Sequence, residues 1–538
     1  MPFGRLLMVV GAVGLVAAVP ACSSGGSPAG AGAGSGKGGT AGAGTTPGTA
    51  GQPAGGAGGS PNAGAGEGGT VGGGVAGTVG ASGTVGASGA SGSAGSTGGM
   101  SGGGGPPCTP PPGGAGGSPT CSPATPPAAK DSVTLDMAMA QGAPTYVGSG
   151  FIYGISEDGT QPPTPLLTDI KVTGFRAGRG VTAGCGQTAW DSHWKVIKGY
   201  YTRAKALGVP MQILVSDNYQ YSCPLPGAGG DWTTFTTFMA QLIAEVQAAG
   251  MTGTDVRWEL WNEPDYSGFW SGTQAQWLDT WKHAYEQVRA AIPGAIIEGP
   301  SLATGAGGSW MSAFLDYCKT NNVMPDYITW HEAGGGGDPV GDLATITRGL
   351  SSRAITSVKG FDLNEYGSTG EQNPGHSGWF LARFARSGID GMRSNWAGGS
   401  EFFSNMGALV GANWQPNSQY WMYKRYADQT GLRTSVTAGT QVDAVAYQDA
   451  CAAKSIVVVG NKGGVTGAVN VVIKNVPGWL QTGGSTKVLL EKMPTGQAAL
   501  SAPMVVSNAA VSVTCNALTV SIDWTTAADG YVVTLSPP

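Results

Sequence analysis

Charge is scarce in this chain of 538 residues. Asp, Glu, Lys and Arg make up only 11% of it, and the formal net charge is −5. A protein that binds the phosphate backbone of a nucleic acid needs a cationic surface, which this balance does not supply. We therefore expect no nucleic-acid partner, and a neutral polymer or oligosaccharide fits the composition better. Dilution by the Gly- and Ala-rich tract before residue 130 explains part of the low charge.

Motifs for metal and nucleotide binding are also missing from the sequence. It contains no Cys-x-x-Cys pair and no His-rich spacing, so we predict no structural zinc and no cofactor. No Ser/His/Asp arrangement is recognisable. The glycine run 334–337 is not a nucleotide fingerprint, because no helix start with the required spacing follows the first strand. We interpret the run as a loop over a cleft.

An apolar run, residues 6–19, lies at the N-terminus after the basic Arg5. It is too short and too early for a stable membrane-spanning helix and is typical of a secretion signal. Its ending, Pro20-Ala21-Cys22, resembles a bacterial lipoprotein signal, in which the cysteine is lipidated after cleavage. We therefore interpret residues 1–22 as a signal peptide. The expected product is exported and is either tethered to the membrane through a lipid on Cys22 or extracellular.

Residues 23–130 consist mainly of Gly, Ala, Ser, Thr and Pro. Such a segment cannot bury enough apolar surface to offset its conformational entropy, so we predict a disordered linker. As a flexible coil it would span roughly 55 Å root-mean-square. It would serve either as a tether that lets a surface protein search for a polymer or as a passive spacer.

Eight cysteines suit an oxidising compartment. Lipidation of Cys22 would leave seven, an odd number. The expected local pairs are Cys108 with Cys121, Cys185 with Cys223, and Cys451 with Cys515. Cys318 falls on the apolar face of an amphipathic pattern, so we expect a buried free thiol there.

The region 131–431 alternates short apolar runs with helical patterns. The eight runs are 151–155, 171–178, 211–216, 256–263, 295–300, 327–331, 361–365 and 391–396. Strand–helix alternation indicates a parallel sheet, and eight units predict closure into a (β/α)₈ barrel. The first helix has little room because of Pro162, Pro163 and Pro165. Residues 132–147 precede the first barrel strand and are expected to add a strand to the C-terminal β-sandwich that follows the barrel.

The sequence pattern changes at residue 432. Short alternating or β-branched runs separated by turn signals follow to residue 538, which predicts an antiparallel β-sandwich. This domain would be either a separate carbohydrate-binding module or a domain packed against the barrel. We favour the second interpretation because the connection between the two domains is short.

Two barrel strands are predicted to end in a glutamate. Glu263 closes the run Trp261-Asn262-Glu263-Pro264, and Glu365 closes a similar run about a hundred residues later. Two carboxylates at one rim of a sheet are what cleavage of a glycosidic bond requires. Asn262 is suited to hydrogen-bond a sugar hydroxyl. Glu259 alternates with the barrel interior, so we expect it to pair with an internal arginine.

These two runs resemble the catalytic strand ends of clan A glycoside hydrolases, which are retaining barrel enzymes. Over residues 131–538 the order, the spacing and the C-terminal sandwich are most similar to family 39, the β-xylosidase and α-L-iduronidase family. The resemblance implies that Glu263 on strand four is the acid/base and Glu365 on strand seven the nucleophile. It also implies substrate-site roles for five further residues: Asn262, His331, Trp396 as a stacking platform, Arg176 as the group that keeps the nucleophile ionised, and Tyr366.

The leading hypothesis is therefore a retaining O-glycoside hydrolase, exo-acting and β-xylosidase-like, with a carbohydrate substrate. An endo-acting glycanase or a transglycosylase would use the same carboxylates. The alternative from another class is a non-catalytic, surface carbohydrate-binding or adhesive protein. Glu157, Glu332 and Glu371 fall on predicted rim loops, where they would bind sugar hydroxyls or simply be solvated.

Overall fold

The structure is a computed structural model that describes residues 121–538 except 181, 183, 333–334, 395–408, 411 and 497–498. Trp396, Cys22 and Cys108 lie outside the described residues. Within the described part, none of the helices combines the length and the apolar character needed to span a membrane.

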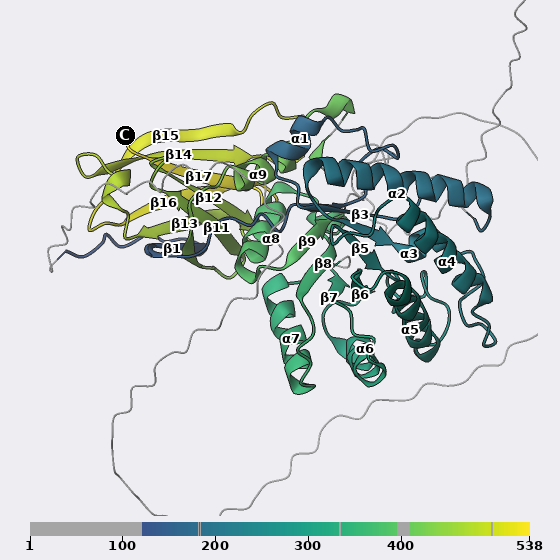
Figure 1. Ribbon diagram of the computed structural model, residues 1–538. Helices are drawn as coiled ribbons and strands as arrows, with labels where there is room; N and C mark the ends of the chain where they lie inside the picture. The colour runs from purple at the N-terminus through teal and green to yellow at the C-terminus, as the bar shows by residue number, and fades with distance from the viewer. Residues whose placement is uncertain are drawn as a thin grey trace, which may run out of the picture. The chain divides into compact units, whose positions relative to one another are not determined.

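Eight parallel strands form a closed barrel, which confirms the predicted (β/α)₈ fold (Figure 1). The strands are β2 (Gly150–Ile152), β3 (Gly174–Ala177), β4 (Met211–Leu214), β5 (Val256–Glu259), β6 (Ile296–Leu302), β7 (Tyr327–His331), β8 (Gly360–Tyr366) and β9 (Asp390–Arg393). Each lies within or overlaps one of the eight predicted runs.

Most of the helices cover the outside of the barrel (Figure 1). The helices are α1 (Thr164–Asp169), α2 (Gln187–Leu207), α3 (Val215–Tyr219), α4 (Thr233–Ala248), α5 (Gln274–Ala291), α6 (Gly308–Asn321), α7 (Pro339–Ser352), α8 (Pro374–Ser387) and α9 (Ser418–Ala427). The first has only six residues, as its prolines predict. The short α3 follows β4 directly at the barrel mouth.

Strand alternation separates an apolar shell from a polar barrel interior. On β3 Phe175 and Ala177 belong to the hydrophobic core, whereas Arg176 between them is buried and pairs with Glu259 across the interior. On β5, likewise, Trp258 belongs to the hydrophobic core, whereas Glu259 faces the barrel interior and pairs with Arg176. Successive side chains of a strand point to opposite faces, so the same short runs supply both the core and the site.

A nine-stranded sheet system forms the sandwich, in the order β15-β14-β17-β12-β11-β10-β1-β13-β16. Its strands are β1 (Asp131–Ala140), β10 (Leu432–Thr437), β11 (Val442–Asp449), β12 (Lys454–Asn461), β13 (Gly467–Lys474), β14 (Ser485–Met493), β15 (Met504–Ser512), β16 (Leu518–Trp524) and β17 (Gly530–Ser536). All pairs are antiparallel except that of β1 with β13.

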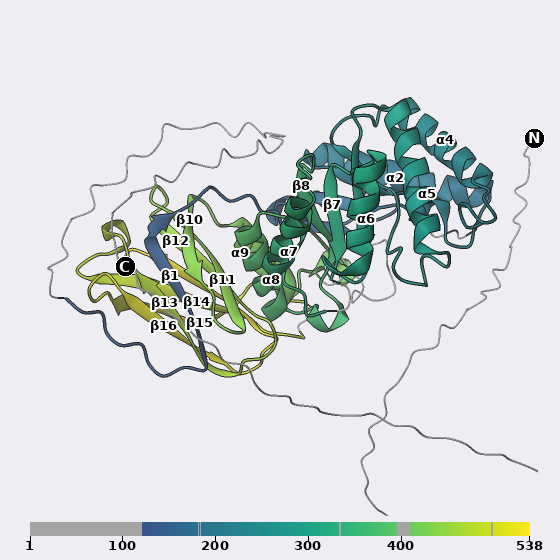
Figure 2. The same ribbon diagram turned by 90° about the horizontal axis from the view of Figure 1, so that it is seen from below.

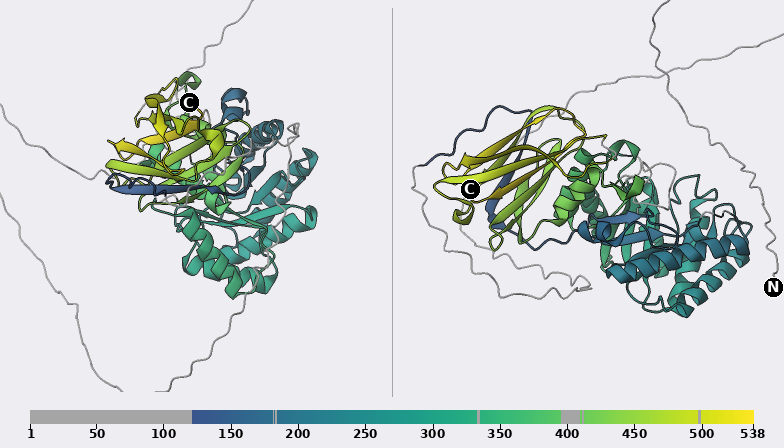
Figure 3. Two further views of the ribbon diagram at one scale, coloured as in Figure 1. Left: turned by 90° about the vertical axis from the view of Figure 1, so that its left-hand side faces the viewer. Right: turned by 90° about the horizontal axis from the view of Figure 1, so that it is seen from above.

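β1 corrects the predicted domain division. It lies among the C-terminal strands, between β10 and β13 (Figures 2 and 3). Residues 131–140 therefore belong to the sandwich, although they precede the barrel in sequence. Val133 and Leu135 of this strand are buried in the core of the sandwich. The alternation of Val133, Leu135 and Met137 is typical of a strand with one buried face.

The disulfides agree with the prediction in part. Cys185 pairs with Cys223, and Cys318 is a buried free thiol, as expected. Cys121 pairs with Cys515, so the expected pairs Cys108–Cys121 and Cys451–Cys515 are wrong. A long-range pair becomes possible because β1 brings the start of the folded chain into the sandwich.

The sandwich packs directly on the barrel helix α8. Val445, Ile456 and Val458 share one hydrophobic cluster with the barrel core. Close approach also requires glycine, since a Cβ on Gly460 would lie 1.8 Å from the backbone nitrogen of Trp379. The continuous core favours a structural sandwich over an independent module.

Candidate active site

Glu263 lies beyond the end of β5, on a strained piece of backbone. β5 ends at Glu259, four residues earlier than the predicted run, and Glu263 has a φ of 44°. Left-handed backbone is uncommon for a glutamate and costs free energy, so the surroundings must hold it. The Glu263 N–H donates to the carbonyl oxygen of Ser301 on β6 over 2.9 Å. This contact fixes the direction in which the carboxylate leaves the barrel.

Glu263, His331 and Glu365 converge at the C-terminal ends of β5, β7 and β8. One ligand atom from each lies within 4.8 Å of the others. His331 Nδ1 is 2.8 Å from Glu263 Oε1 and 3.9 Å from Glu365 Oε2. Carboxyl groups about 5–5.5 Å apart characterise double displacement, whereas single displacement needs a wider gap for a water molecule.

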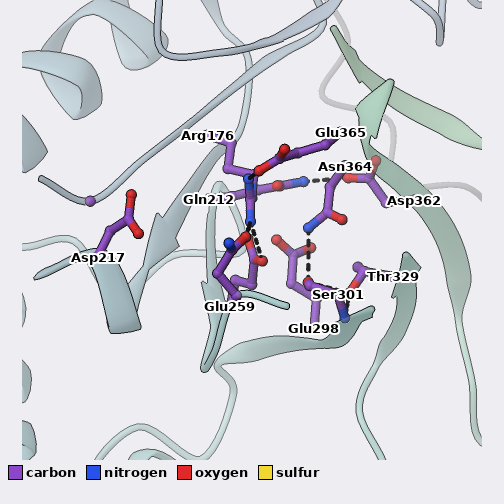
Figure 4. A network of polar contacts seen from close by, with 12 residues as sticks. Arg176, Gln212, Asp217, Glu259, Glu298, Ser301, Thr329, Asp362, Asn364 and Glu365 are labelled. Carbon is purple, nitrogen blue, oxygen red and sulfur yellow. Dashed lines mark hydrogen bonds and ion pairs between the residues drawn. The ribbon is translucent and has the colours of Figure 1, made fainter. Parts of the chain in front are cut away.

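Arg176 holds one of the two carboxylates from inside the barrel (Figure 4). Its guanidinium donates to Glu365 Oε1 over 2.5 Å. It also pairs with Glu259 through two nitrogens, as predicted for an internal arginine. A further bond of 2.6 Å reaches Asn262 Oδ1. Since that oxygen is engaged, Asn262 is left with its amide N–H groups to offer a ligand.

Burial and the neighbouring charges shift the pKa values of Glu365 and His331 in opposite directions. Burial raises the pKa of Glu365, whereas His331 and Arg176 act to lower it. For His331 burial would lower the pKa, but the carboxylates of Glu365 and Glu263 outweigh burial and raise it. His331 therefore tends to hold a proton between two carboxylates.

A second cluster of polar side chains lies deeper in the barrel interior. Gln212 donates to Asp362, and Asn364 donates to Ser301 Oγ over 3.1 Å (Figure 4). Burial raises the pKa of Asp362 to about 7. Burial also raises the pKa of Glu298 well above its ordinary value, although Arg257 acts against this. These groups support the strand ends rather than reach the opening.

One other predicted substrate residue, Tyr366, does not join the cluster. Tyr366 is fully buried on the opposite side of β8, where it packs on Phe380 and Phe384. Its hydroxyl donates to the carbonyl oxygen of Gly148 over 2.6 Å, so the expected substrate contact is wrong. A residue next to Glu365 in a strand must face the other way. Trp396 lies outside the described residues.

The three rim glutamates differ in their partners. Glu157 lies 3.5 Å from Lys195. Glu371 closes a capping box with Ser368 and accepts from the N–H of Gly336 over 3.0 Å. Burial raises the pKa of Glu332 to about 10, and nearby Asp342 and Glu371 add to the shift. Burial therefore favours the protonated form of the Glu332 carboxyl.

Replacing Glu332 with glutamine should flatten the pH dependence of stability. Its folded pKa of about 10 lies above the ordinary value of 4.5, so its contribution is complete below pH 4.5 and is lost as pH rises toward 10. Glu332→Gln should remove a slope of up to about 1.4 kcal/mol per pH unit, measured by urea unfolding from pH 5 to 9. Glu286→Gln, an exposed change on α5, is the control. Equal slopes in wild type and Glu332→Gln would contradict the assignment.

Asp217, at the end of β4, was missed by the sequence interpretation. It accepts hydrogen bonds from Tyr153 over 2.6 Å and from Tyr221 over 2.5 Å. The signal was present, because Asp217 follows a buried strand just as Glu263 does. These two hydrogen bonds connect the loop after β2, which carries Tyr153, with the loop after β4, which carries Tyr221.

Comparison with known proteins finds similarity to glycoside hydrolases over part of the chain. Residues 246–344 match the model of glycosyl hydrolases family 39. A 3-O-α-D-galactosyl-α-L-arabinofuranosidase of Bifidobacterium longum subsp. longum is 23% identical over 55% of this chain and 30% of its own length. A β-xylosidase of Caldicellulosiruptor saccharolyticus is 30% identical over 20% of each chain. The chain thus spans less than a third of the length of these curated relatives.

Solved structures extend the similarity to the whole fold. A protein from Neocallimastix frontalis is 25% identical, with a TM-score of 0.63 over 76% of this chain and all of the other. A monomeric β-xylosidase from Caulobacter crescentus CB15 has 15% identity and a TM-score of 0.53, over 76% of this chain and 99% of its own. The second similarity concerns the fold alone.

Proposed function

We propose that this chain, which is similar to glycoside hydrolases of family 39, is a retaining O-glycoside hydrolase. One observation carries the proposal: two carboxylates at the barrel mouth, with oxygens within 4.8 Å, of which one is bound by a buried arginine and the other by a histidine. The unequal partners give the two carboxylates different roles. Both come from strand ends on the face where barrel enzymes carry their chemistry.

In the first step Glu365 is the nucleophile. Its carboxylate attacks the anomeric carbon, a carbon–oxygen bond to Glu365 forms, and the glycosidic bond breaks. The proton of the Glu263 carboxyl passes to the leaving oxygen. Arg176 favours the anionic form of Glu365 before the attack, because opposite charge stabilises the ionised carboxyl.

In the second step water replaces the leaving group. Glu263, now a carboxylate, takes a proton from the water as its oxygen attacks the anomeric carbon. The bond to Glu365 breaks and the sugar leaves with its original configuration. His331, 2.8 Å from Glu263, stabilises the charge that Glu263 carries between the two steps.

The proposed substrate is a neutral plant-type or microbial glycan from which a terminal sugar is released. The low charge of the chain and the names of the relatives, a β-xylosidase and an arabinofuranosidase, support this class. A panel of 4-nitrophenyl β-xyloside, α-L-arabinofuranoside, β-glucoside and β-galactoside tests it. Release from at least one is expected. No release from any of them, nor from xylan, arabinan, galactan or β-glucan, would contradict a hydrolase and favour a binder.

The Glu263→Gln substitution should lower kcat/KM by an amount that depends on the leaving group of the substrate. Loss of general acid catalysis costs about 10²–10⁴-fold for a sugar leaving group, which needs a proton. An activated 2,4-dinitrophenyl glycoside leaves without one, so its glycosylation step should be nearly normal. The measurement is kcat/KM for both substrates with wild type and Glu263→Gln. An equal loss on both would assign the acid role to another residue.

We further propose that the protein is exported, tethered through Cys22 or free outside the cell. The two disulfides of the described part fit an oxidising compartment. Fractionation of the producing cells tests this, and recovery only from the cytoplasm would contradict it.

A further inference from the structure

An exposed tyrosine, Tyr266, lies three residues after the proposed acid/base Glu263. Tyr266 is 54% exposed and is the one aromatic among the large hydrophobic side chains that are exposed in the described part of the chain. Its N–H donates to the carbonyl oxygen of Glu263 over 3.0 Å, within the loop after β5. A ring this exposed adds little to the hydrophobic core and is accessible to a ligand.

Tyr266 is one end of a row of aromatic rings. Its ring centroid is 5.7 Å from that of Phe269, which lies 4.7 Å from Tyr221. Tyr221 is in turn 6.2 Å from Trp261. We call these four residues the aromatic rim. A hollow of about 170 Å³ lies between the loops after β4 and β5 and is lined by Tyr221, Trp261 and Phe269.

The aromatic rim is connected to the catalytic strand end by hydrogen bonds. The Tyr221 hydroxyl lies 3.0 Å from Ser216 Oγ, which accepts from the Asn262 N–H over 3.0 Å. The Tyr221 loop is also held by the Cys185–Cys223 disulfide to the chain just before α2. The rim is therefore fixed relative to Glu263 before any ligand arrives.

We propose that the accessible end of the aromatic rim, Tyr266 with Phe269, binds the sugar on the leaving-group side of the scissile bond, so that the substrate is an oligosaccharide rather than a small glycoside. This rests on the proposed function. Glu263 must face the leaving oxygen to protonate it, and the rim belongs to the loops beside Glu263. Aromatic faces stack on the apolar C–H faces of pyranose rings, and Tyr266 offers such a face to solvent.

Kinetics with two substrates tests the proposal. β-D-Xylopyranosyl fluoride has no leaving sugar, whereas xylotriose has one or two. In Tyr266→Ala the ratio of kcat/KM for xylotriose to that for the fluoride should fall about tenfold, the scale of a lost stacking contact. Met504→Ala, an exposed change on the sandwich, is the control and should leave the ratio unchanged. An unchanged ratio in both Tyr266→Ala and Phe269→Ala would overturn the proposal.

A binding measurement separates this inference from the proposed function. Calorimetry of Glu365→Gln with xylo-, arabino- and galacto-hexaose needs no turnover. The tightest of the three should bind about tenfold more weakly when Tyr266→Ala is added, and as tightly when Met504→Ala is added. Equal affinity with and without Tyr266, or no binding of any of the three, would overturn the rim proposal. Failure of the proposed function would instead appear as wild type that hydrolyses nothing.

Discussion

Replacing Glu365 with alanine should reduce turnover at least about 10⁴-fold, because no other group can form the covalent intermediate. Glu365 is bound by Arg176 and lies 3.9 Å from His331, so no described carboxylate other than Glu263 shares its position. The measurement is kcat on the best substrate of the aryl glycoside panel. Near-normal turnover with the fold intact would remove double displacement from the account.

Azide distinguishes the two glutamates. In Glu365→Ala it can attack the anomeric carbon directly, which gives a glycosyl azide of inverted configuration. In Glu263→Ala it attacks the covalent intermediate instead, which gives an azide of retained configuration. Products of the opposite configuration from the two variants would mean that Glu263 is the nucleophile and Glu365 the acid/base.

Removing the Arg176 side chain should be among the most destabilising single changes in the barrel. Arg176→Met leaves Glu259 and Glu365 buried without their cation, and breaking a buried ion pair from one side costs about 3–5 kcal/mol. Urea unfolding measures the loss. Arg353→Met is a matched control because Arg353 pairs with the exposed Asp316, where about 1 kcal/mol or less is expected.

A second substitution, at the partner Glu259, tests whether the loss of stability comes from the unpaired carboxylates. Adding Glu259→Gln to Arg176→Met removes one of the two unpaired carboxylates, so part of the lost stability should return. Activity should not return, since Glu365 still lacks its arginine and burial raises its pKa. A double variant as unstable as Arg176→Met alone would show that the Arg176–Glu259 pair is not what stabilises the barrel.

The barrel could be predicted because its strands follow one local rule. Each is a short apolar run that a helical pattern separates from the next, and strand order follows chain order. The rule also located Glu263 and Glu365, since the ends of parallel strands share one face. Even the pairing of Glu259 with an internal arginine followed from strand alternation.

Long-range pairing could not be predicted in the same way. Nothing local indicates that β1 pairs in parallel with β13, or that Cys121 bonds a cysteine 394 residues away. Proximity in sequence favoured the wrong disulfides. Tyr366 was misplaced because the family resemblance put it in the substrate site, whereas the two-residue period of a strand turns it away from the side of Glu365. The chain of contacts from Asn262 to Tyr221 depends on loop geometry, which sequence spacing does not encode.

The stereochemistry of hydrolysis tests the central claim most directly. Proton NMR of the reaction in D₂O identifies the first anomer released, before mutarotation. The short distance between the Glu263 and Glu365 carboxylates predicts a first product with the anomeric configuration of the substrate. Release of the opposite anomer first would mean that water attacks directly, and Glu365 would not be a nucleophile.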